Sequence, residues 1–218
     1  MNTAAIAMSM AVFATSAVSG EVSPISINQT SQHSRLTEQW WQWAMAVPRQ
    51  QSPVSDPSGA RCGDGQTGST WFLAGGFGSS KIRRKCTVPA GRSLFFPLIN
   101  TVYYAARDAE TFTCERAKSL AKLTNDTAID LFAEVDGTPI GNLKAYRFAS
   151  DRCFNIFSRV PRTQSAYNAY PSATDGYWLL LKPLSPGRHT LKFGGKYNHS
   201  SVDFGRMVQD IEYELLVE

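Results

Sequence analysis

The strongest constraint on the fold is a two-residue alternation of apolar and polar side chains in the second half of the chain. Residues 129–135 and 211–217 carry apolar side chains at nearly every second position, which predicts strands with one buried face. Residues 177–181 (YWLLL) are apolar throughout, and we expect this strand to lie centrally, covered on both faces. Tight-turn signals separate the strands, and Asp136-Gly137 after residues 129–135 predicts a hairpin turn. The predicted fold is therefore all-β with minor helices, an antiparallel β-sandwich of jelly-roll or immunoglobulin-like type.

Two helical segments accompany these strands. Apolar residues recur at helical spacing over 36–47, where three tryptophans occur within four positions. Ser34 is the expected N-cap of this helix, and Pro48 is expected to end it. Two of the three tryptophans should pack on the body of the protein, with Trp41 further round the helix. Residues 114–123 also have helical spacing and predict a helical insertion.

The first 20 residues contain no charged side chain and end in small residues. This pattern predicts a signal peptide over residues 1–20, although no Lys or Arg precedes the apolar run. A buried N-terminal helix is the alternative. The remaining residues, 21–218, are expected to form a single β-sandwich domain in a secreted or periplasmic protein.

Charge and hydropathy exclude several classes of protein. The net charge is +4, too small for a nucleic-acid-binding face. The basic run KIRRK at residues 81–85 is expected in or beside a hairpin turn, where its charges are solvated. No apolar stretch after residue 20 is long enough for a transmembrane helix, so we expect no membrane span once the signal is removed. The oligomeric state stays open.

The four cysteines form an even set, which in an oxidising compartment indicates two disulfides. Three pairings are possible. We favour Cys62 with Cys86 and Cys114 with Cys153, because each pairing closes the shorter loop. No cysteine has the spacing of a zinc site, and we expect neither a metal nor a cofactor.

Three longer segments resemble those of an uncharacterised family of secreted bacterial β-sandwich proteins. They are WFLAGG at residues 71–76, CTVPAGRSLFFPLIN at residues 86–100 and DGYWLLLKPLSPGRHTLKFGG at residues 175–195. The resemblance implies an exported β-sandwich. It implies no catalytic residue, because the family has no assigned activity.

Catalytic motifs are absent from the sequence, which contains no GxSxG, HExxH or phosphate-binding glycine loop. Carboxylates in loops are the remaining candidates for catalysis, because glycoside cleavage needs two acids about 5–10 Å apart. The weak catalytic candidates are Glu110, Asp175, Arg147 and His189. Asp175 precedes a glycine and is expected in a turn, while His189 is expected to have a structural role. Whether the protein is an enzyme stays open.

Loop aromatic residues suggest binding instead, because aromatic rings stack on sugars without needing charge. Tyr103, Tyr104, Tyr167 and Tyr170 are expected in loops, and Asn100 is expected at a strand end. These five residues are the predicted binding set.

Three functions compete. The leading hypothesis is an exported, non-enzymatic protein that binds a carbohydrate or cell-envelope component through an exposed aromatic patch. The first alternative is an extracellular hydrolase or lyase, which needs a pocket where acidic or imidazole groups converge. The second alternative is an interaction protein that docks a partner through an exposed Trp-rich helix.

Overall fold

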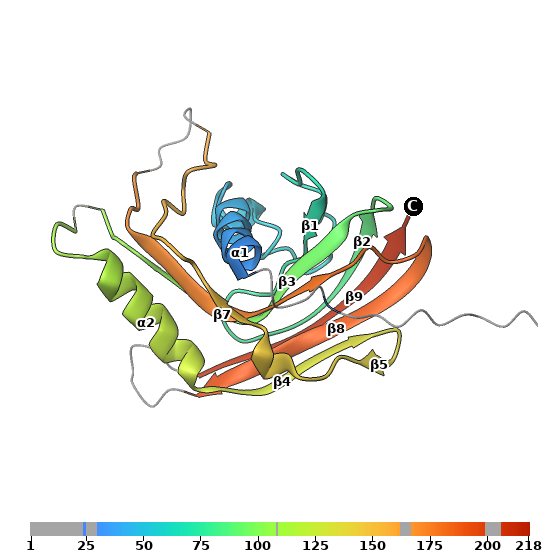
Figure 1. Cartoon of the computed structure of the whole chain (residues 1–218). Coiled ribbons are helices and arrows are strands. Elements are labelled where there is room, and N and C mark those ends of the chain that lie inside the picture. Colours follow the sequence, from blue (N-terminus) through green and yellow to red (C-terminus); the bar gives the residue numbers. More distant parts are fainter. Residues whose placement is uncertain (1–23, 25–29, 108, 162–166, 199–205) are drawn as a thin grey trace, which may run out of the picture.

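A computed structural model of the chain describes residues 24, 30–107, 109–161, 167–198 and 206–218, and shows two β-sheets stacked face to face (Figure 1). Sheet A has the strand order β1 (Thr70–Phe72), β3 (Ser93–Tyr104), β7 (Ser172–Leu181), β6 (Arg147–Ala149). Sheet B has the order β2 (Ser80–Val88), β9 (Arg206–Val217), β8 (Gly187–Asn198), β4 (Ala128–Val135), β5 (Thr138–Pro139). The prediction of an all-β sandwich with minor helices is confirmed.

The strand pairing differs from the prediction in one respect. Most neighbouring strands run antiparallel, but β1 pairs with β3 and β2 pairs with β9 in parallel. Both sheets are therefore mixed rather than purely antiparallel. Parallel partners are joined by long connections, and β2 and β9 are separated by more than a hundred residues, so no local sequence signal reports their pairing. The choice between jelly-roll and immunoglobulin-like topology stays a prediction.

The strand β7 is the centre of the molecule, as the YWLLL run predicts. Every residue of β7 is buried. Leu179 and Leu181 face sheet B and join the core between the sheets. Trp178 and Leu180 face the opposite way and join a second core under α1 (Thr30–Ala44). The β4–β5 hairpin also forms as expected, with Asp136 and Gly137 both at positive φ.

The helix α1 lies across the outer face of sheet A (Figure 1). It begins before the predicted N-cap, so Ser34 is a buried residue inside the helix. It ends at Ala44, whose carbonyl accepts a hydrogen bond of 2.7 Å from the Ser52 hydroxyl, and not at Val47 as predicted. Trp41 is buried like Trp40 and Trp43, with 8% of its surface exposed, and donates a hydrogen bond to Thr174. All three tryptophans therefore pack on the body of the protein, and not only two as predicted.

The helix α2 (Cys114–Asp126) confirms the predicted insertion and packs against β3 and β7. Both disulfides form as favoured, Cys62 with Cys86 and Cys114 with Cys153. The first ties the loop before β1 to β2, and the second ties the start of α2 to the segment after β6. Within the described residues, no helix is long and apolar enough to cross a membrane.

The basic run at residues 81–85 lies inside β2, and not in or beside a turn. Its outward side chains pair with acidic side chains of β9 at 3.3–3.4 Å, in the pairs Lys81–Asp210, Arg83–Glu212 and Lys85–Glu214. Arg84 points inward and is buried. The strand tolerates this charge because a neighbouring strand supplies matching carboxylates in register. The predicted signal peptide, residues 1–20, lies outside the described residues, and the single-domain boundary at residues 21–218 stays a prediction.

Candidate functional site

Two of the predicted catalytic residues, Arg147 and Asp175, lie together. Arg147 donates two hydrogen bonds to the Asp175 carboxylate, at 2.9 and 3.2 Å, and one to Asp126 at 2.8 Å. Lys122 pairs with Asp126 at 2.8 Å. We call these four residues the Arg147 cluster. Asp175 lies within β7 and not in a turn, so its predicted location is wrong.

The electrostatics of the Arg147 cluster are those of a structural ion pair. Partial burial works against the charge of Arg147, but hydrogen bonds to Asp175 and Asp126 outweigh it and raise its pKa. Burial raises the pKa of Asp175, while Arg147 opposes that rise. A hydrogen bond from Lys122 is the main cause of the lowered pKa of Asp126. Because the acidic groups are engaged by cations, the cluster links α2, β6 and β7 and presents no free carboxylate.

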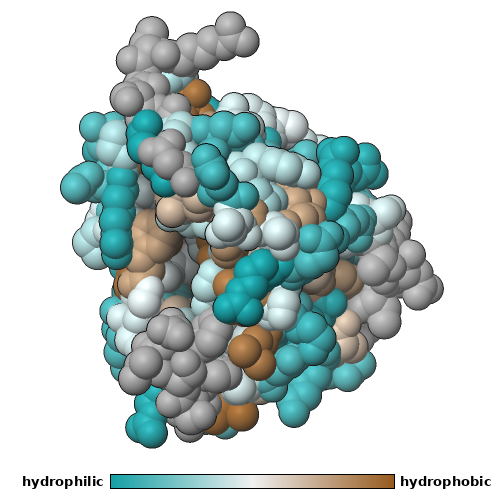
Figure 2. All heavy atoms as spheres, turned by 90° about the vertical axis from the view of Figure 1, so that its left-hand side faces the viewer, coloured by the Kyte–Doolittle hydropathy of each residue, from teal (hydrophilic) through white to brown (hydrophobic). Residues whose placement is uncertain are grey.

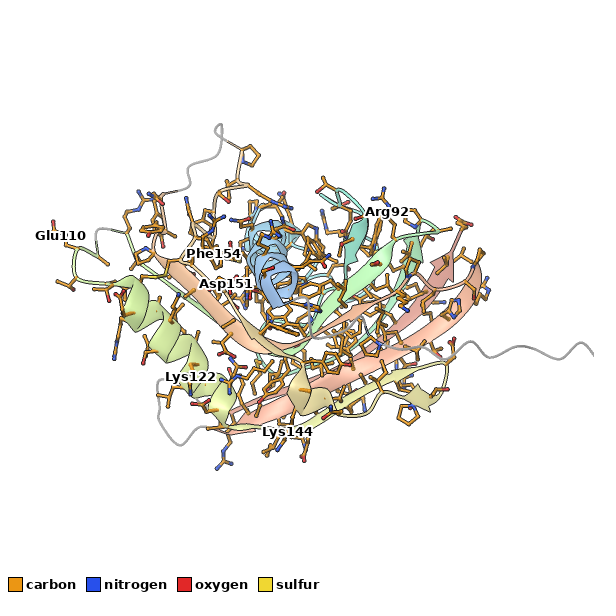
Figure 3. The ribbon with its side chains drawn as sticks, in the orientation of Figure 1. Arg92, Glu110, Lys122, Lys144, Asp151 and Phe154 are labelled. Atoms are coloured by element: carbon orange, nitrogen blue, oxygen red, sulfur yellow. A yellow bond between two sulfur atoms is a disulfide. The ribbon has the colours of Figure 1, made fainter. Side chains whose placement is uncertain are left out.

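Glu110 is remote from this cluster. It lies exposed in the loop before α2, and Figure 3 shows it near one end of the helix while Lys122 lies near the other. The carboxylate pair that glycoside cleavage requires is therefore not formed by Glu110 and Asp175.

His189 has the contacts of a structural imidazolium. Its Nδ1 lies 2.7 Å from the Asp136 carboxylate and its Nε2 lies 2.9 Å from the Ser185 carbonyl oxygen. The Ser185 hydroxyl is further away, at 3.5 Å from Nε2. Burial disfavours the charged ring, but the hydrogen bonds to Asp136 and Ser185 outweigh it and raise the pKa of His189. With both nitrogens facing acceptors, the ring donates twice and has no lone pair available to act as a base.

The predicted aromatic binding set is mostly half-buried, and two of its members, Tyr104 and Tyr167, lie around one shared ring. Tyr103 and Tyr104 belong to β3 and not to a loop, which corrects their predicted location. Tyr104 and Tyr167 both contact Phe157, with ring centroids 5.7 and 5.3 Å away, and all three rings are partly buried. Tyr170 is the exposed member of the predicted tyrosines, at 56%.

Asn100 also lies inside β3, opposite Gly176 of β7. A side chain on Gly176 would collide with Asn100, with an ideal Cβ only 2.6 Å from the Cβ of Asn100. Of the five predicted residues, Tyr170 is exposed and the other four are half-buried. Seen from the α2 side, the coloured surface is mostly hydrophilic, with small separate hydrophobic areas (Figure 2).

A pocket of about 340 Å³ lies instead beside α1, between the helix and the segment that enters β1. This volume is at the low end of the range of about 300–1,000 Å³ found for ligand sites. Polar side chains dominate its lining, and the described residues that line it include no carboxylate and no imidazole. They are Gln32, Arg35, Leu36, Gln39, Thr67, Gly68, Ser69, Thr70, Phe72 and Arg159. We call this the α1 pocket.

The loop before β1 forms one wall of the α1 pocket. Hydrogen bonds of one amide side chain, that of Gln66, hold this loop in place. The Gln66 amide donates to the carbonyl oxygens of Cys62 and Phe72, at 2.9 and 2.8 Å, and accepts from the Phe72 N–H at 3.0 Å. The Trp43 indole donates to the Asp64 carbonyl at 2.7 Å and joins the loop to α1. The disulfide at Cys62 adds a covalent link to β2. The wall is therefore preorganised.

Two arginines give the α1 pocket its charge. Burial lowers the pKa of Arg159, with no carboxylate nearby to offset that cost. Glu38, one turn after Arg35 on α1, is buried and lies 3.9 Å from Arg152, and it does not line the pocket. Burial raises the pKa of Glu38, an effect that Arg152 opposes. Within the described residues, neither Arg35 nor Arg159 forms a salt bridge, although the charge of Arg35 also acts to lower the pKa of Glu38.

Sequence reasoning missed the α1 pocket. The available signal was weak: the stretch between Asp151 and Asp175 contains arginines but no acidic residue, so a cation there has no local counterion. Nothing in the sequence indicates that this stretch meets α1 and the loop before β1. Comparison of the chain with protein-family models, curated proteins and solved structures finds no match, so the resemblance to a secreted bacterial family stays a prediction.

Proposed function

We propose that this protein is an exported, non-enzymatic β-sandwich protein that binds a carbohydrate or another cell-envelope component in the α1 pocket. The observation that carries the proposal is the lining of that pocket, which combines hydroxyl, amide and guanidinium groups over two apolar side chains. Such a lining offers hydrogen bonds to the hydroxyl groups of a sugar and apolar contact to its ring. The two disulfides support a secreted or periplasmic location.

The two alternatives have less support. A hydrolase or lyase needs an available acid and base, whereas Asp175 is bound by Arg147 and both ring nitrogens of His189 face acceptors. Partner docking through the Trp-rich helix needs exposed indoles, whereas Trp40 and Trp43 are only 2% and 3% exposed. Binding in the α1 pocket uses groups that the fold leaves accessible.

A pocket-filling variant tests the proposal. Ser69 lines the pocket and its side chain is exposed, so Ser69→Trp should occupy the site without disturbing the core. Thr87→Trp, on the exposed face of β2, is the matched control. In calorimetric titrations with neutral and acidic oligosaccharides, we expect saturable binding by the wild type and by T87W and none by S69W. No saturable binding by the wild type, or unchanged binding by S69W, would contradict the proposal.

A further inference from the structure

The charge of the α1 pocket points to a narrower class of ligand. We propose that the pocket binds a saccharide carrying a carboxylate, such as a uronic-acid oligomer, and that Arg35 and Arg159 hold the carboxylate. This inference rests on the proposed function, because it names the ligand class of the same site.

The first argument is the positive charge of the pocket lining. Arg35 and Arg159 line one pocket whose described residues include no acidic side chain. Arg35 is exposed and acts electrostatically on Glu38, which does not line the pocket, whereas burial disfavours the charge of the half-buried Arg159. A bound anion would offset that cost. A carboxylate fits best, because the planar guanidinium donates two parallel hydrogen bonds to its two oxygens.

The second argument is the chemistry of the remaining lining. Gln32 and Gln39 supply amide donors and acceptors from α1, and Thr67, Ser69 and Thr70 supply hydroxyl groups from the opposite wall. These neutral polar groups match the hydroxyl groups of a sugar. Leu36 and Phe72 are buried at 7% and 4% exposure and provide an apolar floor. A small inorganic anion would leave most of these groups unused.

The third argument is preorganisation. Arg35 lies on a helix that Trp40 and Trp43 anchor to sheet A, with Trp40 donating a hydrogen bond to the Leu73 carbonyl at 3.0 Å. The opposite wall is held by the Gln66 amide and the Cys62–Cys86 disulfide. A rigid site loses little entropy when a ligand orders it. The walls of the α1 pocket are therefore held in place before a ligand binds.

The test compares a tetragalacturonate with its carboxyl-reduced, neutral counterpart by calorimetric titration. The proteins are the wild type, Arg35→Gln, Arg159→Gln and the control Arg188→Gln, an exposed arginine of β8 outside the pocket. We expect the acidic sugar to bind at least about tenfold more tightly than the neutral sugar. R35Q and R159Q should each weaken binding of the acidic sugar about tenfold, and R188Q should not. Raising the salt concentration should weaken it further.

The outcomes separate this inference from the proposed function. Equal binding of the two sugars, with R35Q and R159Q unchanged, would overturn the carboxylate inference and leave carbohydrate binding intact. Binding of neither sugar would overturn the carboxylate inference, and S69W titrated with other envelope saccharides then decides the broader proposal. Thermal melting of each variant identifies any loss of binding that comes from unfolding.

Discussion

Arg147 of the Arg147 cluster and Arg159 of the α1 pocket are both half-buried, but their charges have opposite surroundings. In the cluster, Arg147 donates to two carboxylates at 2.8–2.9 Å. In the pocket, Arg35 and Arg159 share a space whose described lining has no acidic group. The free energy of folding favours the arrangement in the cluster, where the arginine is paired with carboxylates, because an unpaired, partly buried charge costs free energy. The difference supports a structural role for the cluster and agrees with our proposal that the pocket binds a ligand.

Arg84 is a second arginine whose donors are engaged within the fold, as those of Arg147 are. It is 2% exposed and neutral oxygens surround its guanidinium, with no carboxylate bound to it. The acceptors are the carbonyl oxygens of Val54, Asp56, Ala74 and Gly75 and the hydroxyl of Tyr213, at 2.7–3.3 Å. One cation therefore joins β2 to β9, to the loop before β1 and to the segment after β1.

The largest expected effect comes from removing Arg84. Arg84→Met leaves several buried carbonyl oxygens without a donor, and we expect a loss of about 3 to 5 kcal/mol in the free energy of unfolding. Denaturant titration measures it. Arg83→Met is the matched control, because Arg83 is the preceding residue and its side chain is 77% exposed; we expect a loss below about 1 kcal/mol. Equal losses in the two variants would contradict a structural role for Arg84.

Removing Arg147 should have the next largest effect. Arg147→Met leaves the carboxylate of Asp175, only 9% exposed, without its cation. We expect a loss of about 2 to 3 kcal/mol in the free energy of unfolding, and the double variant with Asp175→Asn should recover part of it. Lys122→Met, at a side chain that is 66% exposed, serves as control and should cost about 0.5 kcal/mol. A stability loss for R147M no greater than that of K122M would remove the contrast with the pocket.

The His189–Asp136 pair predicts a pH dependence of smaller size. The pKa of His189 is raised above its usual 6.5, so its contribution is complete below pH 6.5 and is lost as the pH rises through the folded-state pKa. Hydrogen bonds from His189 and Thr190 outweigh burial and lower the pKa of Asp136 below its usual 3.8, so its contribution is lost at acidic pH. The pair is strongest between these limits. His189→Gln should reduce by about 1 kcal/mol the decline in stability from pH 6 to pH 9. An unchanged profile in H189Q would argue that this imidazole is not charged in the fold.

The smallest stability effect is expected in the α1 pocket itself. Arg159→Gln removes a partly buried charge that has no described partner, so the free energy of unfolding should change by less than about 0.5 kcal/mol or rise slightly. Thermal melting in the absence of sugar measures this. A loss similar to that of R147M would mean that Arg159 has a structural partner, and the pocket would then lose its distinction from the cluster.

The parts of the fold that could be predicted are those that depend on residues close together in the sequence. The YWLLL run had to be covered on both faces, and α1 and sheet B cover it. The favoured disulfides follow from loop length, and the Asp136-Gly137 turn follows from residues that accept positive φ. In each case the deciding residues are neighbours in the chain.

The predictions that were wrong concern residues whose surroundings are set by segments distant in the chain. Arg84 could not be singled out within KIRRK from the sequence, because its acceptors come from distant segments. The loop before β1 and the segment after β1 supply carbonyl oxygens to Arg84, while β9 supplies carboxylates to the outward side chains of the run. Asp175 looked like a turn residue because it precedes a glycine, yet that glycine is required by the close approach of Asn100 across the strands. The α1 pocket draws on α1, the loop before β1 and Arg159, and their meeting depends on tertiary structure alone.

The central contrast can be measured directly by following the Nε–Hε signals of the arginine side chains in ¹⁵N-labelled protein during titration with tetragalacturonate. We expect the signals of Arg35 and Arg159 to shift and saturate together, while those of Arg84 and Arg147 stay in place because their donors are already engaged. Saturable shifts at Arg147 with none at Arg159, or no shift at either pocket arginine, would contradict the assignment of the α1 pocket as the ligand site.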